Sequence, residues 1–375
     1  MRGGLTMKNN SLDKRILVCG TGFGKVYLNA ISKIPGYKIA GILARGSERS
    51  LKLAEQFGVP LYSDPCDEKI CADCACVVVP NAAGGGNGTE IAIKLLKRGI
   101  PTLLEHPVHE KEIVKCIRES GEVPFMLNPF YRYVDPIQDF LKAAEFLRKK
   151  ATLLNASLNC AIHVLYDGLD ILGCALGDIS PWKLGNVADI PDVDAEMTKI
   201  ELGKGNKTVG ALVGGIPVSI TVNTEIDRND PDHPLHLYHG IELTFSTGRL
   251  CLVNTHGPVI WLPFLRIPRN QEKSFDLLFK NEESQISSAL IIGSEAAPNM
   301  EETFNVIWAR GIKKALETLI SQSKSDKIQS AQFQIFISRL WSEVCRKVGY
   351  SSFVSYGEQP SVVTNYREFR KWGIL

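Results

Sequence analysis

The sequence carries almost no net charge and no long apolar run. Its 43 lysines and arginines against 41 aspartates and glutamates give a net charge of +2, so no strong field draws the chain to nucleic acid or to an anionic membrane. No stretch approaches the roughly 20 apolar residues of a membrane-spanning helix. Residues 1–14 are polar and lack a signal-peptide core, which predicts a flexible extension on a cytoplasmic protein that binds neither nucleic acid nor membrane.

A cysteine pattern for disulfides or zinc is also missing, although the chain has ten cysteines. Most of them lie in apolar or periodic segments, where a reduced cysteine acts as a small hydrophobic residue. Cys66, Cys71, Cys74 and Cys76 come closer to a metal pattern. However, no second pair follows at zinc-ribbon spacing and Cys76 begins an apolar strand, so we predict no metal site there.

An early glycine turn connects the first predicted strand to the first helix. Ile16–Cys19 runs into Gly20-Thr21-Gly22-Phe23-Gly24, and a helical stretch follows at once. A helix N-terminus above such a turn complements a pyrophosphate, so we predict that all five residues of the turn contact a dinucleotide. The third glycine comes one residue early, which indicates a shortened loop. The alternative is an ordinary tight strand–helix turn.

The second predicted strand is followed by arginines instead of an acid. An Asp or Glu at this place accepts from the ribose 2′-hydroxyl of NAD and repels a 2′-phosphate. Two guanidiniums, a hydroxyl and a helix N-terminus suit a phosphate dianion, which favours NADP(H) over NAD(H). The predicted contacts are Ala44, Arg45, Gly46, Ser47 and Arg49. The alternative is a solvated basic turn in which Glu48 cancels part of the charge.

Residues 15–135 alternate short strands with helices, which is typical of a doubly wound parallel sheet and predicts a Rossmann domain. The expected strands are 16–19, 37–43, 76–79, 101–104 and 125–127, and the expected later helices are 50–57, 89–98 and 110–119. Ligands of such sheets bind beyond the carboxyl ends of the strands. Val79, Pro80 and Asn81, and then Glu105 and His106, follow two of these strands, so we predict that they also contact the cofactor.

Strands in succession dominate the second half, after expected helices at 136–149 and 163–176. The period-two runs are 195–202, 207–213, 218–225, 241–246, 250–254 and 259–262. They predict an α+β substrate and dimerisation domain over 136–375, built on a large, mostly antiparallel open sheet.

Two amphipathic helices close the predicted domain and pack partly back on the first one. They cover 301–320 and 329–348 and flank a polar connecting loop, 321–328. Their aromatic residues are predicted to lie in the core; these are Phe304, Trp308, Phe333 and Trp341.

Three histidines recur at every third position in a loop rich in Asp and Pro. Pro234 breaks any single helical face across His233, His236 and His239. We therefore favour a loop on the substrate side over a metal site, with His236 and His239 as candidate substrate contacts.

The glycine turn, a Glu-x-Pro after a first-domain strand and the α+β second domain together resemble the glucose–fructose oxidoreductase and inositol dehydrogenase superfamily. Its usual members carry Glu-Lys-Pro, and His106 stands here in place of that lysine. The superfamily also often carries Asp-x3-His on the first long helix of the second domain, and those two positions fall on His163 and Asp167. The usual acid/base histidine is therefore missing, which counts against sugar or polyol dehydrogenation.

A narrower resemblance, to thiazolinyl imine reductases, covers segments from about residue 15 to 348. The similar segments are 24–30, 43–50, 105–109, 128–131, 257–261 and 338–341. The resemblance implies NADPH-dependent reduction of a thiazoline C=N to a thiazolidine in siderophore biosynthesis of the yersiniabactin or pyochelin type. It also implies a substrate tethered to a carrier domain of a nonribosomal peptide synthetase, and a homodimer.

Reduction of a C=N bond needs a hydride at carbon and a proton at nitrogen. We predict His106 and Tyr131 as the proton-delivery pair, because an imidazole with a pKa of about 6.5 can give a proton at neutral pH. The alternatives are a hydrogen-bonded loop histidine and aromatic packing. Asn128 either orients the substrate or caps a turn, and Glu105 holds the nicotinamide ribose or its own loop.

Asp167 and Asp170 lie three residues apart on one predicted helix face. Asp167 is a candidate substrate contact, while Asp170 is expected to tie the helix to its neighbours. Two other functions remain open: an NADP-dependent dehydrogenase of a sugar or polyol hydroxyl, and an inactive relative that senses NADP(H) and binds a regulatory protein.

Overall fold

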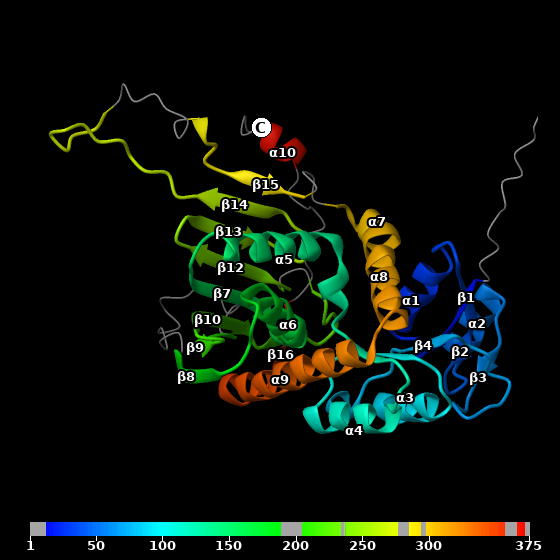
Figure 1. The fold of residues 1–375 in the computed structure, drawn as a ribbon. Coiled ribbons are helices and arrows are strands. Elements are labelled where there is room, and N and C mark those ends of the chain that lie inside the picture. The colour runs from blue at the N-terminus through cyan, green and yellow to red at the C-terminus, as the bar shows by residue number, and fades with distance from the viewer. Residues whose placement is uncertain are drawn as a thin grey trace, which may run out of the picture.

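The computed structural model describes residues 13–188, 205–233, 236, 238–276, 285–293, 298–356 and 366–371. Two sheets lie side by side, each covered by helices (Figure 1). The extension predicted over 1–14 falls outside the described residues as far as residue 12, and Lys14 already belongs to a strand. No helix within the described ranges is both long and apolar enough to cross a membrane.

The first sheet has six parallel strands in the order β3-β2-β1-β4-β5-β6. They are β1 (Lys14–Cys19), β2 (Tyr37–Leu43), β3 (Leu61–Tyr62), β4 (Cys74–Val77), β5 (Thr102–Glu105) and β6 (Phe125–Asn128). β4, β5 and β6 are buried along their whole length because helices cover both faces, as in a doubly wound sheet. The predicted Rossmann architecture is confirmed.

The helices of this domain are α1 (Gly24–Ile31), α2 (Glu48–Phe57), η1 (Ala82–Gly84), α3 (Gly88–Lys97) and α4 (Glu110–Ser120). β4 begins and ends two residues before the predicted strand 76–79, since Ile16 of β1 pairs with Cys74. The small side chains of Cys74 and Ala75 therefore lie in the core and not in a cysteine-rich loop. All ten cysteines are free.

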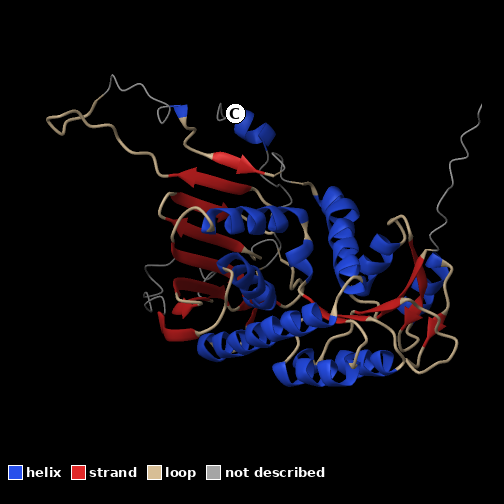
Figure 2. Cartoon of the chain, viewed as in Figure 1, coloured by secondary structure: helices blue, strands red, loops and turns tan. Residues whose placement is uncertain are grey.

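The second sheet has eight strands in the order β15-β14-β13-β12-β7-β10-β9-β8 (Figure 2). Neighbouring strands within it are antiparallel, except β7 and β10, which are parallel. The strands are β7 (Leu153–Ala161), β8 (Trp182–Ala188), β9 (Asn206–Val213), β10 (Ile216–Asn223), β12 (Gly240–Phe245), β13 (Gly248–Leu252), β14 (Val259–Pro263) and β15 (Leu290–Ile292). A small parallel pair joins β11 (Glu225–Asp227) to β16 (Ser352–Val354). The predicted large, mostly antiparallel sheet is confirmed, although β7, β8 and β15 were not predicted and the predicted strand 195–202 lies outside the described residues.

The remaining helices follow β6 in the chain; three of them pack on the second sheet, and some also reach the first domain. They are η2 (Phe130–Tyr133), α5 (Asp135–Arg148), η3 (Ile162–Val164), α6 (Leu165–Leu176), α7 (Met300–Glu302), η5 (Thr303–Ile307), α8 (Trp308–Ile320), α9 (Lys324–Val348) and α10 (Tyr366–Lys371). α5, α6 and α9 pack on the sheet, while α8 also packs against α1, and α9 against α4 (Figure 1).

Two predictions about these last helices are wrong. Residues 324–328 were predicted as loop, but α9 begins at Lys324, because Ser323 and Asp326 form a reciprocal capping box. Phe304 was predicted in the core, but it is 39% exposed, while Trp308 one turn later is buried.

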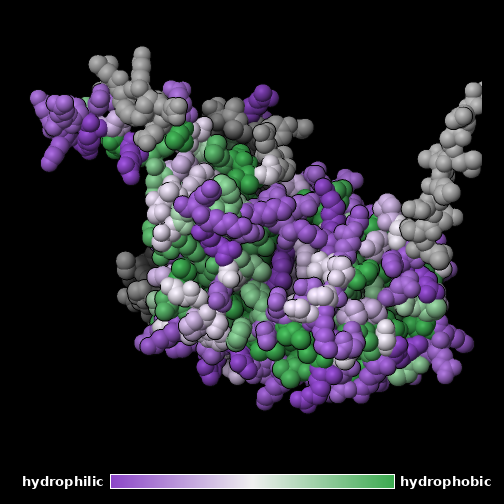
Figure 3. All heavy atoms as spheres, in the orientation of Figure 1, coloured by the Kyte–Doolittle hydropathy of each residue, from purple (hydrophilic) through white to green (hydrophobic). Residues whose placement is uncertain are grey.

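The face drawn in Figure 3 is mainly hydrophilic with smaller apolar patches.

Candidate functional site

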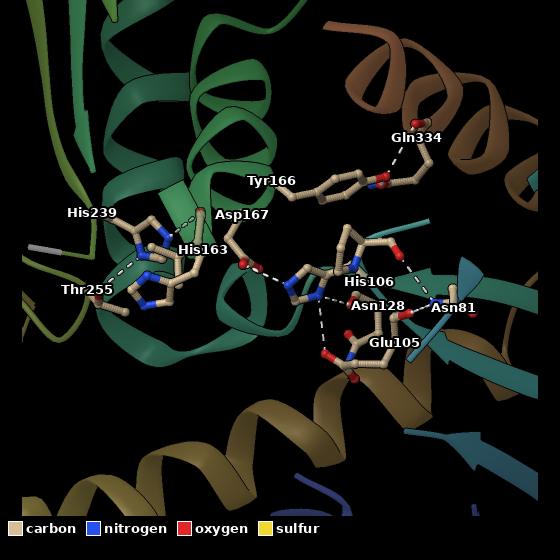
Figure 4. A network of polar contacts seen from close by, with 12 residues as sticks. Asn81, Glu105, His106, Asn128, His163, Tyr166, Asp167, His239, Thr255 and Gln334 are labelled. Atoms are coloured by element: carbon tan, nitrogen blue, oxygen red, sulfur yellow. Dashed lines mark hydrogen bonds and ion pairs between the residues drawn. The ribbon is translucent and has the colours of Figure 1, made fainter. Parts of the chain in front are cut away.

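The site is built where the carboxyl ends of β1, β2, β4, β5 and β6 meet the start of α6. The loops after these strands come from the first domain, and η3 with α6 comes from the second. Figure 4 shows His106 of the first domain between Glu105, Asn128 and, across the domain junction, Asp167. The two domains therefore share one polar network.

The glycine turn has the shape that a dinucleotide needs. Gly20 has φ +98°, and a Cβ there would lie 2.5 Å from the carbonyl oxygen of Val78, so only glycine fits. A Cβ at Gly22 would meet no described atom within 4 Å, and α1 starts two residues later with Phe23 at its N-cap. The turn thus leaves open space in front of a helix N-terminus, which fits a pyrophosphate.

The segment after β2 presents two exposed guanidiniums beside this turn. Arg49 donates from Nε to the hydroxyl of Thr21 at 3.4 Å, which joins the two loops. Ser47 caps α2, and Gly46 has φ +82°. Glu48 pairs with Lys52 at 2.6 Å, one turn along α2, so its carboxylate is directed to that lysine and not to the arginines. Ala44 lies half-buried at the end of β2.

Asn81 holds the loop that carries His106. Its amide donates to the carbonyls of Glu105 at 2.8 Å and Pro107 at 3.2 Å, and its Oδ1 accepts from Thr89 at 3.0 Å. The side chain is therefore occupied within the protein, and the predicted cofactor contacts of Val79, Pro80 and Asn81 stay predictions.

Glu105 is anchored from behind by Tyr27 of α1. The Tyr27 hydroxyl donates to Glu105 Oε2 in a very short hydrogen bond and accepts from the Asn128 amide at 2.6 Å. Burial, followed by the nearby Glu105 charge, raises the pKa of Tyr27 well above its ordinary value, so the phenol stays protonated. Asn128 is 1% exposed and faces this cluster, so a role in orienting substrate is not what its side chain does here.

His106 has a hydrogen-bond acceptor at each ring nitrogen. Nδ1 lies 2.9 Å from the Asn128 carbonyl and 3.2 Å from Glu105 Oε1, and Nε2 lies 2.8 Å from Asp167 Oδ2. Oxygen atoms near both nitrogens favour the ring with hydrogen on each of them, the imidazolium. Burial lowers the pKa of His106, but the Asp167 and Glu105 carboxylates outweigh it and raise that pKa well above 6.5. The ring also stacks on Tyr166, with centroids 5.6 Å apart.

The two carboxylates of α6 serve different partners. Asp167 is 1% exposed and turns to His106, while Asp170 accepts from Arg132 Nε at 2.7 Å and from Gln334 at 2.8 Å. Asp170 thus ties α6 to η2 and α9, as expected. Gln334 also accepts from the Tyr166 hydroxyl at 3.1 Å, which fixes the ring under His106. The two aspartates do not form a paired-carboxylate site.

Tyr131 lies in an aromatic cluster between the domains. Its ring packs edge-on against Phe130, Trp308 and His239, with centroids 5.3, 6.4 and 5.1 Å away. Burial, with the Asp167 charge second, raises the pKa of Tyr131 well above 10, so it stays a neutral phenol. No hydrogen bond within the described residues joins it to His106, and its predicted part in proton delivery stays a prediction. Phe23 extends the cluster to the glycine turn, 5.1 Å from Phe130.

The histidines of the second domain are placed unequally. His239 is fully buried with Nδ1 3.0 Å from Thr255 Oγ1 and Nε2 3.3 Å from the Val164 carbonyl, and burial lowers its pKa to about 4. Both nitrogens are thus engaged away from a ligand. His236 is buried against the ring of His163, with centroids 5.5 Å apart. In the described part of the chain, no group of three or more His, Cys, Asp or Glu side chains is arranged to hold a metal ion.

Several residues of the polar network around His106 were not predicted from the sequence. Tyr27 lies in a segment that carries the family resemblance, but nothing local links it to Glu105, 78 residues away. Tyr166, Arg132 and Gln334 act only through tertiary contacts. The one available signal was Asp167 itself, because it stands where the superfamily places its acid/base histidine.

Two different family models match this chain, one within each of its two domains. Residues 14–128 match the oxidoreductase family with an NAD-binding Rossmann fold, and residues 150–262 match the C-terminal domain of the thiazolinyl imine reductase Irp3-like type. No curated protein sequence gives a significant match.

Solved structures share the fold at low sequence identity. An oxidoreductase from Agrobacterium radiobacter, in complex with NAD+, L-tartaric acid and magnesium, has a TM-score of 0.63 and 14% identity over 90% of this chain and 96% of its own. A 3-ketoreductase from Actinomadura kijaniata with NADP has a TM-score of 0.58 and 14% identity over 88% of this chain and 96% of its own. Biliverdin reductase from Synechocystis, with biliverdin and NADP+, has a TM-score of 0.58 and 11% identity over 88% and 99%.

The two matched segments confirm the resemblance drawn from the sequence and the nicotinamide dinucleotide as cofactor class. Residues 14–128 thus match the oxidoreductase family with an NAD-binding Rossmann fold, and residues 150–262 match the C-terminal domain of the thiazolinyl imine reductase type.

Proposed function

We propose that this protein is an NADPH-dependent imine reductase that reduces a thiazoline C=N bond to a thiazolidine in siderophore biosynthesis. The observation that carries the proposal is the position of His106 between the carboxylates of Glu105 and Asp167 at the carboxyl end of β5, which favours its protonated form. A C=N bond accepts a proton at nitrogen as it accepts hydride at carbon, so a group that is already protonated suits this reaction.

The coenzyme fits the turn and the arginines that the first domain provides. The open space at Gly22 and the N-terminus of α1 suit the pyrophosphate, and Arg45, Ser47 and Arg49 suit a 2′-phosphate, which supports NADPH over NADH. When bound, the nicotinamide supplies the hydride that the substrate carbon receives.

His106 gives its proton from Nε2, the nitrogen at the domain junction, when the substrate nitrogen replaces Asp167 Oδ2 as the acceptor of that hydrogen. Glu105 and Asn128 hold Nδ1, and Tyr166 supports the ring face, so the ring has little freedom to turn away. Asp167 stabilises the cation before the transfer, and the neutral phenol of Tyr131 is the second donor of the proposal.

Oxidation of a hydroxyl is the alternative, and the same geometry disfavours it. A dehydrogenase needs a base that takes the hydroxyl proton. His106 is already protonated, and Asp167, in place of the usual histidine, is neutralised by it. The inactive NADP(H)-sensing alternative is disfavoured because the chain has both predicted proton donors, His106 and Tyr131.

A carrier domain of a nonribosomal peptide synthetase, a homodimer and the cytoplasm belong to the proposal as its partner, assembly and location. They follow from the resemblance to thiazolinyl imine reductases, which act on tethered substrates.

The test compares NADPH oxidation by a thiazoline thioester mimic with NADP+ reduction by sugars and polyols. We expect NADPH oxidation with the thiazoline and formation of the thiazolidine by mass spectrometry. Turnover with a sugar or polyol and none with the thiazoline would overturn the proposal in favour of a dehydrogenase. Coenzyme binding without any turnover would favour the sensing alternative.

A further inference from the structure

Once His106 has given up its proton, a new one must reach a ring that is closed on nearly every side. Its side chain is 13% exposed, Tyr166 stacks on one face, and Nδ1 is bonded to Asn128 and Glu105. The cleft side is occupied while coenzyme and substrate are bound. The remaining contact of the ring is Nε2 with Asp167, so the route of the new proton leads through that carboxylate.

Asp167 has a second oxygen available for this purpose. Oδ2 lies 2.8 Å from His106 Nε2 as an ion pair, and Oδ1 faces no such cation; both oxygens are buried and neither has a hydrogen bond among the described residues. A buried carboxylate oxygen without a donor is unfavourable unless a water or a mobile proton serves it. Asp167 itself is 1% exposed and has no direct path to bulk solvent.

His163 lies one turn before Asp167 and connects it to the surface. His163 lies in the 3₁₀ turn η3, which runs directly into α6, and the Asp167 carboxylate acts on the pKa of its ring across this junction. Both ring nitrogens of His163 are buried without a hydrogen-bond partner among the described residues, and Nε2 lies 3.9 Å from Oδ1 of Asp232. The Asp232 side chain is 75% exposed. Figure 4 shows His163 and Asp167 together beside the His106 network.

We infer that His163 is a positioning residue for proton transfer, which relays a proton from solvent at Asp232 to Asp167 and so reloads His106. This inference rests on the proposed function. Water at Asp232 gives a proton to His163 Nε2, and His163 releases its other proton from Nδ1, directly or through one water, to Asp167 Oδ1. The Asp167 carboxyl group then turns, so that this same proton faces His106 and passes to its neutral Nε2, which leaves Asp167 a carboxylate again. The net change is one proton taken from solvent and one imidazolium restored.

The surroundings of His163 keep it suited to pass protons. His236 and Tyr238 pack against its ring, with centroids 5.5 Å away in each case, and Asp232 and Asp167 are the carboxylates that act on it. Burial lowers the pKa of His163 below 6.5, against the opposing effect of Asp232, so the resting ring is neutral. A neutral imidazole accepts at one nitrogen and donates from the other, as a relay requires.

The test follows the exchange of the His106 Nε2 proton with water by NMR, in the full-length protein without substrate. We expect exchange at least fivefold slower in His163→Gln and in His163→Phe, which keeps an aromatic ring in place. His233→Gln is the matched control, because that imidazole packs on His236, with centroids 6.1 Å apart, one ring away from His163, and its exchange should stay as in the wild type. Exchange unchanged in both His163 variants would overturn the relay.

Turnover gives a second readout that a purely structural role would not change. With the thiazoline mimic, His163→Gln should lower kcat with little change in KM, and small imidazole buffers should restore kcat in proportion to their concentration. Asp232→Asn, an exposed change that keeps the fold, should have the same effect more weakly. A kcat loss without rescue by buffer would contradict the relay. Normal relay behaviour in the NMR test with no thiazoline turnover in the wild type would instead contradict the proposed function alone.

Discussion

The site has two parts, which differ in exposure and in how far the protein itself occupies their polar groups. The coenzyme end, formed by the glycine turn and the arginines after β2, is exposed and leaves donors and space unused by the protein. The proton end, formed by His106 and its neighbours, is buried, and each nitrogen of the ring is already bonded. The first end is shaped for a ligand that comes from outside. The second is preorganised by the protein, so its protonation state is set before substrate arrives.

The largest expected effect comes from His106 itself. His106→Ala should lower turnover of the thiazoline mimic about 10²–10³-fold, because it removes a positioned general acid. The dissociation constant of NADPH, measured by fluorescence titration, should stay within about twofold of the wild type. His109→Ala is the control, since that histidine only caps α4 by accepting from the Lys111 amide. A loss of NADPH affinity equal to the loss of rate would mean that His106 serves the coenzyme and not the proton.

Asp167→Asn should follow, with a loss of about 10–100-fold in turnover. Without the Asp167 charge the pKa of His106 falls, so the decline of kcat on the alkaline side should begin at lower pH than in the wild type. A pH profile from 5 to 10 checks the direction. An alkaline limb that does not move would separate Asp167 from the ionisation of His106.

The same substitution changes how stability depends on pH. His106 has a raised pKa in the folded chain, so its stabilising effect is complete below about 6.5 and is lost as the pH rises through the folded value. Asp167→Asn should therefore lower the free energy of unfolding by about 3 kcal/mol at pH 6 and by less at pH 10. Urea titrations at both pH values measure the difference, and a larger loss at the higher pH would contradict the assigned charge.

Part of this comparison could be predicted from the sequence and part could not. The residues of the coenzyme end are close together in the sequence. Gly20–Gly24 and Ala44–Arg49 are each contiguous, and each follows a strand that its apolar sequence predicts. The proton end joins Tyr27, Glu105 and Asp167 across 78 and 62 residues of chain, and no spacing rule connects them. His106 was predicted as a donor with an ordinary pKa, because its two carboxylate neighbours appear only in the folded chain.

The helices and strands also divide into those that a local sequence signal marks and those that tertiary pairing decides. β7 was missed although Leu153–Ala161 alternates polar and apolar residues as a strand does, because Asn155 and Asn159 have low strand propensity and its pairing with β10 and β12 decides its structure. The start of α9 does have a local signal, since Ser323 and Asp326 have capping-box spacing.

The glycines of the turn offer a contrast within the coenzyme end. Gly20→Ala should lower the free energy of unfolding by about 2–3 kcal/mol, because it combines a positive φ with a contact to Val78. Gly22→Ala should leave unfolding within about 0.5 kcal/mol of the wild type. It should nevertheless weaken NADPH binding, because its methyl group enters the space in front of α1. Thermal unfolding with and without NADPH separates the two effects, and equal destabilisation by both would contradict this reading of the turn.

The smallest effect is expected from the arginines. Arg49→Ala and Arg45→Ala should each weaken NADPH binding about tenfold, or about 1.4 kcal/mol, and leave NADH binding unchanged. Lys52→Ala is the control, because Lys52 pairs with Glu48 at the surface. Equal losses for both coenzymes would remove the preference for the 2′-phosphate.

The ionisation state of His106 tests the central claim most directly. Nitrogen NMR of the full-length protein at pH 8, with the His106 signals assigned by their loss in His106→Gln, reports whether both ring nitrogens carry hydrogen. The structure predicts an imidazolium at this pH, held by Glu105 and Asp167. A neutral imidazole at pH 8 would contradict a proton stored at His106 for the reduction.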